Sequence, residues 1–261
     1  MRFSSCRADE RVLVVVPTYN ERESLPWLLA DLLALPTDRL EVLVVDDNSP
    51  DGTGELAEEF SRASGGRVRV LHRAGKEGLG RAYAAGMTEA LAAGAAVVVQ
   101  MDADGSHPVE AIERMLTALR ASSAAVAVGS RYVAGGSVDA DWPWHRRVLS
   151  SGANAYVRGV LGLSVQDATA GFKAWDAHAL RSLEPDTVMS NGYSFQVELA
   201  HRATVAGLRS VEVPIHFVDR TEGRSKMSLG VQAESFLMPW RLRRTRWRPT
   251  VVVDVAAAAL R

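Results

Sequence analysis

Over the first half of the chain, short apolar runs alternate with longer segments in which apolar residues recur at helical spacing. The runs are continuously apolar, which is typical of strands buried on both faces of a sheet. They predict strands at Val12–Val16, Leu40–Val45, Val68–Leu71, Ala95–Met101 and Ala124–Val128. The segments between them predict helices at Glu23–Leu35, Thr53–Ser64, Gly78–Ala93 and Val109–Ala121. This alternation predicts an α/β fold with a mostly parallel central sheet flanked by helices.

The second half is less regular. A long loop rich in glycine and tryptophan, residues 132–147, follows Arg131, and a turn-rich piece, SVQDATAGFKAW, comes later. The remaining pattern predicts helices at Arg147–Leu161, Phe195–Gly207 and Leu229–Arg244, and a strand at Arg209–Val218. We expect one large domain at residues 11–228, preceded by a flexible N-terminus (1–10) and followed by an amphipathic, basic extension (229–261).

Polar segments directly follow four of the predicted strands. They read PTYNE, DDNSPDGT, DADGSH and GSRY. Ligands of open α/β sheets bind beyond the carboxyl ends of the strands, so four such segments at one edge predict a site. A G-x-G-x-x-G motif would follow the first strand in a dinucleotide-binding fold, and its absence argues against NAD or FAD.

The acidic pair in VVVQMDADGSH is the most informative of these segments. Residues i and i+2 of a strand point to one face, so Asp102 and Asp104 emerge side by side where the strand ends. Adjacent carboxylates repel each other, and a site that holds them together usually binds a cation. Mg²⁺ and Mn²⁺ are hard cations of the kind held by one or two carboxylates plus substrate phosphates. The alternative is a solvated loop after a strand.

Composition narrows the classes of function and the cellular locations that fit this chain. The net charge of −1 gives no case for nucleic-acid binding, and no Cys/His cluster suggests zinc. The single cysteine, Cys6, excludes an intrachain disulfide and fits a reducing compartment. The N-terminal segment lacks the apolar core of a signal peptide, and no apolar run reaches the roughly 20 residues that span a bilayer. We therefore expect a cytoplasmic protein that can still lie on a membrane.

Two further segments carry candidate ligand groups. Asp47 is a better ligand candidate than its neighbours, because a carboxylate accepts hydrogen bonds from a base or ribose, whereas Ser49, Asp51 and Thr53 are good turn and cap residues. The segment DRTEGRSK carries Arg220, Arg224 and Lys226, the residue types that recognise phosphates. An exposed charged hairpin is the alternative for this segment.

The motifs PTYNE, DDNSPDGT, DADGSHPVE, GSRYVAGG, WPWHRRVLSSGAN, DATAGFKAW and VPIHFVDRTEGRSKMS occur in this order. Together they resemble the polyprenol- or dolichyl-phosphate mannosyltransferases of glycosyltransferase family 2, which have the GT-A fold. The resemblance covers about Val12 to Ser228. It implies metal-dependent, inverting transfer of mannose from GDP-mannose to a polyprenyl monophosphate, and residues 11–228 would then be a GT-A catalytic domain.

The resemblance also implies roles for individual residues. The donor nucleotide would contact Pro17, Tyr19, Glu21, Asp47, Asp102 and Ala103. The metal, Mg²⁺ or Mn²⁺, would be held by Asp102 and Asp104, and Ser106 stands where some relatives carry a glutamine ligand. The acceptor phosphate would contact Arg131, Arg146, Arg220 and Lys226, with Arg147 as the alternative to Arg146. Asp104, Arg131, Arg220 and Lys226 are the expected catalytic groups.

The acceptor explains why no general base stands out. A phosphate monoester has a second pKa near 6, so it is largely ionised at neutral pH and needs no base. Glu198 is the best candidate if a base exists, although a carboxylate on a helix face, without a catalytic role, is the preferred interpretation. His107 follows the acidic motif and precedes Pro108, and a role in shaping this turn is enough to explain it.

The segment ESFLMPWRLRRTRWRP interleaves apolar and aromatic residues with arginines, which fits an interfacial helix on an anionic membrane leaflet. A helix packed on the domain is the alternative, and a membrane-anchored partner protein is a further expectation from the resemblance. Two rival functions stay open: a polyprenyl-phosphate glucosyltransferase that uses UDP-glucose, and a nucleotide-sugar-binding protein without turnover. The sequence leaves the prenyl chain length, the preferred metal and the oligomeric state undetermined.

Overall fold

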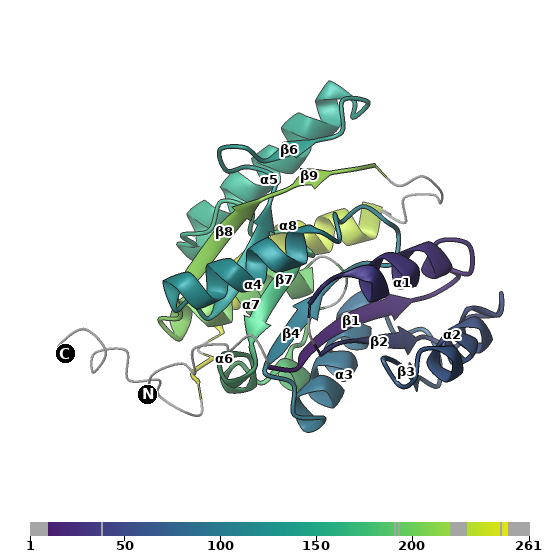
Figure 1. Cartoon of the computed structure of the whole chain (residues 1–261). Helices are drawn as coiled ribbons and strands as arrows, with labels where there is room; N and C mark the ends of the chain where they lie inside the picture. Colours follow the sequence, from purple (N-terminus) through teal and green to yellow (C-terminus); the bar gives the residue numbers. More distant parts are fainter. Residues whose placement is uncertain are drawn as a thin grey trace, which may run out of the picture.

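The computed structural model describes residues 10–37, 39–190, 192, 194–219, 229–245 and 247–249, with the backbone alone at 229–235. A seven-stranded sheet in the order β3-β2-β1-β4-β7-β5-β8 forms its centre (Figure 1). The strands are β1 Val12–Thr18, β2 Leu40–Asp46, β3 Val68–His72, β4 Val97–Gln100, β5 Val126–Ser130, β7 Lys173–Asp176 and β8 Ser210–Pro214. All run parallel except β7, which is antiparallel to both β4 and β5. The predicted α/β class with a mostly parallel sheet is confirmed.

Helices cover both faces of the sheet. Alternate residues of β1 enter two different cores, with Leu13 and Val15 in one and Val12 and Val14 in the other. The first core is completed mainly by α3, α6 and α7, and the second by α1 and α4, which lie on the opposite face (Figure 1). The helices are α1 Leu25–Ala34, α2 Thr53–Ala63, α3 Leu79–Ala92, α4 Ala111–Ser122, α5 Trp144–Leu161, α6 Ala177–Ser182, the 3₁₀ helix η1 Pro185–Thr187, α7 Ser194–Val205 and α8 Leu229–Arg244.

The structure differs from the predicted elements in the second half of the chain. The turn-rich piece contains β7, and the long loop contains the short strand β6, Ser137–Val138. The predicted strand Arg209–Val218 is two strands, because Ile215 separates β8 from β9, His216–Phe217. Strand β9 leaves the central sheet and pairs with β6.

Helix α8 packs on the domain against α5 and α7. Its Leu242 belongs to a buried core, and the Tyr156 hydroxyl of α5 donates to the Phe236 carbonyl at 2.7 Å. The packed-helix alternative therefore describes residues 229–245, although Phe236 and Trp240 keep exposed side chains. Within the described part of the chain, no helix is both long and apolar enough to cross a membrane.

Candidate active site

The four polar segments meet at one edge of the sheet. Strands β1, β2, β4 and β5 run in the same direction, so their carboxyl ends lie together. The first two segments are joined by hydrogen bonds. The Asp47 amide donates to the Thr18 carbonyl at 3.1 Å, and the Glu21 amide donates to Thr53 Oγ1 at 3.0 Å. The predicted convergence is confirmed.

The acidic motif is fixed by hydrogen bonds from its surroundings. The Tyr83 hydroxyl of α3 donates to Asp102 Oδ1 at 2.6 Å, and the Ser106 amide donates to Asp104 Oδ1 at 3.1 Å. Burial raises the pKa of Tyr83 well above its usual value, and Asp102 and Asp104 raise it further, so Tyr83 is a protonated donor. Ser106 is buried, and its hydroxyl oxygen has no hydrogen-bond partner within the described residues.

His107 is a structural part of this motif. Its ring stacks on Phe172 at a centroid distance of 5.0 Å, and its Nδ1 accepts from the Asp102 amide at 3.2 Å. Burial lowers the pKa of His107, although Asp102 and Asp104 oppose this, so the imidazole is neutral and can accept that hydrogen bond. The expectation that His107 shapes the turn agrees with these contacts.

The DATAGF segment lies directly against the acidic motif. A Cβ atom placed on Gly171 would lie 3.3 Å from Asp102 Oδ2 and 3.4 Å from His107 Cε1. A larger residue here would be in tight contact with the carboxylate and would require it to shift by a few tenths of an ångström. The segment that holds Arg131 through Asp167 thus also contacts the acidic motif.

Two cations to which the sequence analysis gave no role lie beside residues that were expected to contact the nucleotide. Asp47 forms an ion pair with Arg73, and Lys76 Nζ lies 3.9 Å from the centre of the Tyr19 ring. Burial raises the pKa of Asp47, while Arg73 lowers it. Asp46, by contrast, accepts hydrogen bonds from Thr18 of the neighbouring strand β1 and from Ser49 in the turn after β2.

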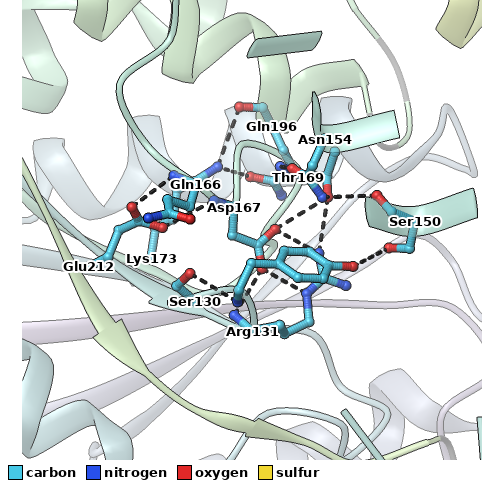
Figure 2. A network of polar contacts seen from close by, with 11 residues as sticks. Ser130, Arg131, Ser150, Asn154, Gln166, Asp167, Thr169, Lys173, Gln196 and Glu212 are labelled. Atoms are coloured by element: carbon cyan, nitrogen blue, oxygen red, sulfur yellow. Dashed lines mark hydrogen bonds and ion pairs between the residues drawn. The ribbon is translucent and has the colours of Figure 1, made fainter. Parts of the chain in front are cut away.

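Arg131 is held in a planar fork by Asp167, a residue to which the sequence analysis gave no role (Figure 2). Arg131 Nε and Nη2 each donate to Asp167 at 2.7 Å, and the Arg131 amide donates to it at 3.0 Å. The Asp167 side chain is fully buried. Such a bidentate pair fixes both the position and the plane of the guanidinium.

Further partners tie this fork to two other elements (Figure 2). The Glu212 carboxylate of β8 accepts from the amides of Gln166 at 2.7 Å and Asp167 at 3.0 Å. Thr169 Oγ1 accepts from Arg131 Nη2 and from Asn154 Nδ2 of α5, each at 3.0 Å. The Arg131–Asp167 pair is thus held in place by hydrogen bonds from both β8 and α5.

A hollow of about 390 Å³ opens beside Arg131. It is lined by Arg131, Tyr132, Ser137, Val138, Trp142, Arg147, Val148 and Ser151. Two arginines, two serines and a tyrosine make this lining suitable for an anion.

The structure separates the two arginines that the sequence left open. Arg147 lines the hollow with Arg131, and its Nη2 donates to the Asp139 and Ala140 carbonyls at 2.8 Å. Arg146 instead forms an ion pair with Asp219 at 2.7 Å and stacks on Trp142 at 4.0 Å. Arg147 is therefore the arginine of the two that lies beside the hollow, because successive residues of a helix point in different directions, and the contact of either with an acceptor phosphate stays a prediction.

Phe217 connects the acidic and basic halves of the edge. Its ring lies 5.7 Å from the His107 ring and 5.3 Å from the Arg131 guanidinium. The segment that follows β9 carries Arg220, Arg224 and Lys226, which lie outside the described residues. Glu198 is buried and accepts hydrogen bonds from Arg202 at 2.7 Å and from Ser190.

The fold and this acidic edge define a GT-A glycosyltransferase. The sequence model of the family described as "Glycosyl transferase family 2" matches residues 13–183, and the chain belongs to this family. It is 48% identical over 225 residues, 86% of this chain and 84% of the relative, to a polyprenol monophosphomannose synthase from Mycolicibacterium smegmatis. It is 47% identical over 238 residues, 91% of this chain and 93% of the relative, to an undecaprenyl-phosphate mannosyltransferase from Micrococcus luteus.

Solved structures of lower sequence identity share the fold. A mannosyltransferase from Pyrobaculum calidifontis in complex with GDP-Man and Mn²⁺ superposes with a TM-score of 0.62 at 18% identity, over 92% of this chain and 66% of that one. Glucosyl-3-phosphoglycerate synthase from Mycobacterium tuberculosis in complex with Mn²⁺, UDP and phosphoglyceric acid gives 0.66 at 20% identity, over 92% and 81%. The family and the GT-A fold expected from the motifs are confirmed.

Proposed function

We propose that this enzyme transfers mannose from GDP-mannose to a polyprenyl monophosphate, with inversion at the anomeric carbon. The two relatives named for mannosyl transfer to a polyprenyl phosphate support the reaction class. The observation that carries the proposal is the single edge at which Asp102 and Asp104 stand across Phe217 and His107 from Arg131. A donor anchored by the acids thereby faces an anionic acceptor anchored by the arginines.

The acidic motif suits Mg²⁺ or Mn²⁺. Within the described residues, His, Cys, Asp and Glu side chains do not gather in threes in a way that would hold a metal alone. Two carboxylates completed by substrate phosphates are typical of a hard divalent cation. Asp102 and Asp104 would hold it, and the unpartnered Ser106 hydroxyl is an oxygen that could join them. The bound cation would stabilise the negative charge that develops on the leaving diphosphate.

The hollow beside Arg131 is the proposed acceptor site. Its arginines, Arg131 and Arg147, would bind the phosphate, together with Arg220 and Lys226 of the following segment. An oxygen of that phosphate attacks C1 of the sugar as the bond from C1 to the GDP oxygen breaks, which inverts the configuration. No base is needed because the phosphate is already ionised near neutral pH. His107 is neutral and committed to the Asp102 amide, and Glu198 is committed to Arg202, which agrees with this mechanism.

Transfer of labelled sugar into organic-extractable lipid tests the proposal and its rivals. GDP-mannose and UDP-glucose are compared with the same polyprenyl phosphate. Labelled lipid from GDP-mannose supports the proposal, whereas labelled lipid from UDP-glucose alone identifies a glucosyltransferase. Donor binding without any lipid product would identify a binding protein without turnover.

Tyr83→Phe is expected to weaken metal binding without disturbing the fold. The variant removes only the hydroxyl that donates to Asp102, while the ring still stacks on Phe195 at 5.9 Å. Residues that orient metal ligands typically contribute about 10- to 100-fold in metal affinity or activity. We expect the Kd for Mn²⁺, measured by calorimetry with GDP, to rise about tenfold. An unchanged Kd would contradict the role of Tyr83 in positioning Asp102.

We also propose that the protein is peripheral at the inner face of the membrane. Helix α8 exposes Phe236, Leu237 and Trp240 beside the exposed Arg241, Arg243 and Arg244. Its neighbour α5 exposes Trp144, Val148 and Leu149 near the hollow. Apolar side chains next to arginines suit an anionic bilayer.

Trp240→Ser combined with Phe236→Ser should reduce sedimentation with vesicles that contain anionic lipid. Exposed positions are chosen because deleting α8 would also remove the buried Leu242. Trp27→Ser is the matched control, since Trp27 is 77% exposed on α1, on the other face of the sheet. Equal sedimentation of the double variant, the control and the parent protein would remove the proposed membrane contact.

A further inference from the structure

Lys173 places its side-chain amine in the core, and among the described residues no carboxylate lies within ion-pair distance of it. The residue is 1% exposed. Its hydrogen bonds to described residues all go to Gln196 of α7, at 3.0 Å to Oε1 and 3.3 Å to the carbonyl. Gln196 Oε1 also accepts from Gln100 Nε2 at 3.0 Å. A buried lysine whose hydrogen-bond partners are neutral is costly to keep charged, so its protonation responds to any charge placed nearby.

Its position in the sheet lies between the two halves of the site. Lys173 begins β7, opposite Gln100 on one side and Val128 on the other. Asp102 follows Gln100 by two residues, and Arg131 follows Val128 by three. Lys173 therefore belongs to the strand between the two that lead to the proposed donor and acceptor sites, and it lies in the same polar network as Arg131 and Asp167 (Figure 2).

The charged groups that act on Lys173 are Asp167 and Arg131, while α7 and β4 present the neutral amides of Gln196 and Gln100. Burial lowers the pKa of Lys173 to about 7, Asp167 raises it, and Arg131 lowers it. Asp167 is already committed to the Arg131 fork. An additional anion beside Arg131 would therefore favour the protonated lysine.

We propose that Lys173 is a positioning residue that takes up one proton from solvent when the lipid phosphate binds beside Arg131, and that its charge then stabilises that phosphate from beneath. This inference rests on the proposed acceptor site and adds to it a pH-dependent control of acceptor binding. Lys173 does not touch the reacting atoms and is not a catalytic residue.

The test compares the acceptor KM of the wild type and Lys173→Met between pH 6 and 9. Methionine has a similar shape but no charge. Below pH 7 Lys173 of the wild type is already protonated before the acceptor binds, and its charge favours binding of the lipid phosphate. Lys173→Met lacks this charge, so its acceptor KM should be about tenfold higher, the change in affinity that corresponds to a pKa change of one unit on binding. Above pH 8 the free wild type is neutral, and the two KM values should converge. The donor KM should stay unchanged at every pH.

Lys173→Arg supplies the rescue experiment. Its guanidinium remains charged throughout this pH range, so its acceptor KM should not rise between pH 7 and 9 as that of the wild type does. The ionisation of the lipid phosphate affects all three proteins alike and cancels in the ratios. A ratio of the Lys173→Met to the wild-type KM that does not vary with pH overturns the inference.

Thermal unfolding gives a second readout that needs no substrate. The unfolded lysine binds its proton up to a pKa of about 10.4, so the unfolded state holds more protons between pH 7 and 10.4. The free energy of unfolding of the wild type therefore rises with pH in that window. Below pH 7 the wild type bears the full cost of burying the charged lysine. We expect Lys173→Met to have a higher Tm than the wild type at pH 6.5, with the gap closing toward pH 10.

Arg114→Met, an exposed position on α4, is the matched control for the unfolding measurement. A lower Tm of Lys173→Met at all pH values would show that the lysine is merely structural and would overturn the inference. The two proposals fail differently. Absence of any mannosyl lipid in the wild type contradicts the proposed function, whereas normal lipid synthesis with a pH-independent ratio contradicts only the role of Lys173.

Discussion

Replacing Asp104 with alanine is expected to lower kcat/KM by about 10³-fold, which corresponds to the several kcal/mol that a bound cation contributes to a charged transition state. The Asp104 carboxylate accepts a hydrogen bond from the Ser106 amide at 3.1 Å, within its own turn. Without it the leaving diphosphate loses its proposed link to the protein. Activity should be titrated against Mn²⁺ and Mg²⁺, and circular dichroism should show an unchanged fold.

Glu110→Gln is the matched control for Asp104→Ala. Glu110 is an exposed carboxylate six positions further along the same segment, so its loss changes the local charge equally. We expect the control to keep its activity and its response to metal. Turnover by Asp104→Ala at the level of this control would contradict the metal assignment.

The second large effect is expected from Asp167→Asn. The amide keeps the size of the side chain but loses the charge that receives both arms of Arg131, and the guanidinium is then free to leave its plane. We expect kcat/KM for the polyprenyl phosphate to fall about 100-fold, because small displacements of a positioning group can cost that much. The Kd for GDP-mannose should change little, since the donor is proposed to bind to other residues.

Glu41→Gln controls for the loss of a bidentate ion pair as such. Arg11 Nε and Nη2 donate to the Glu41 carboxylate at 2.7 and 2.5 Å, and the pair lies near the amino ends of β1 and β2, opposite the site. Its loss should lower stability slightly and leave both kinetic constants unchanged. If Asp167→Asn weakened donor and acceptor equally, its proposed role in acceptor binding would be wrong.

The first half of the fold was predictable because its information is local. Strands β1, β2 and β4 are continuous apolar runs, and burial on both faces leaves no ambiguity about their type. Strand β7 was missed because it has four residues and begins with a lysine and ends with an aspartate, which outweigh Ala174 and Trp175 in a sequence pattern. Its antiparallel insertion between β4 and β5 depends on contacts that are distant in sequence.

The same distinction applies to the site. Asp102 and Asp104 could be found because they directly follow a buried apolar run, although β4 ends at Gln100 and the two acids lie in the loop and turn after it rather than in the strand. The fork from Arg131 to Asp167 joins residues 36 positions apart, and nothing local marks Asp167 as its partner. Arg146 and Arg147 are chemically identical neighbours, so only the orientation of α5 separates them. Lys173 could not be singled out from the sequence, because a lysine is usually exposed and only the structure shows that this one is buried.

The measurement that tests the central claim most directly is the lipid-transfer activity of a double variant that combines Asp104→Ala with Asp167→Asn. Label from GDP-mannose is followed into organic-extractable lipid for the parent protein, Asp104→Ala, Asp167→Asn and the two controls, with and without a metal chelator. Our account predicts metal-dependent mannosyl lipid from the parent protein and both controls, and severe loss in both site variants and their combination. Undiminished lipid synthesis in the combined variant would contradict the claim that these acids and bases form one active site.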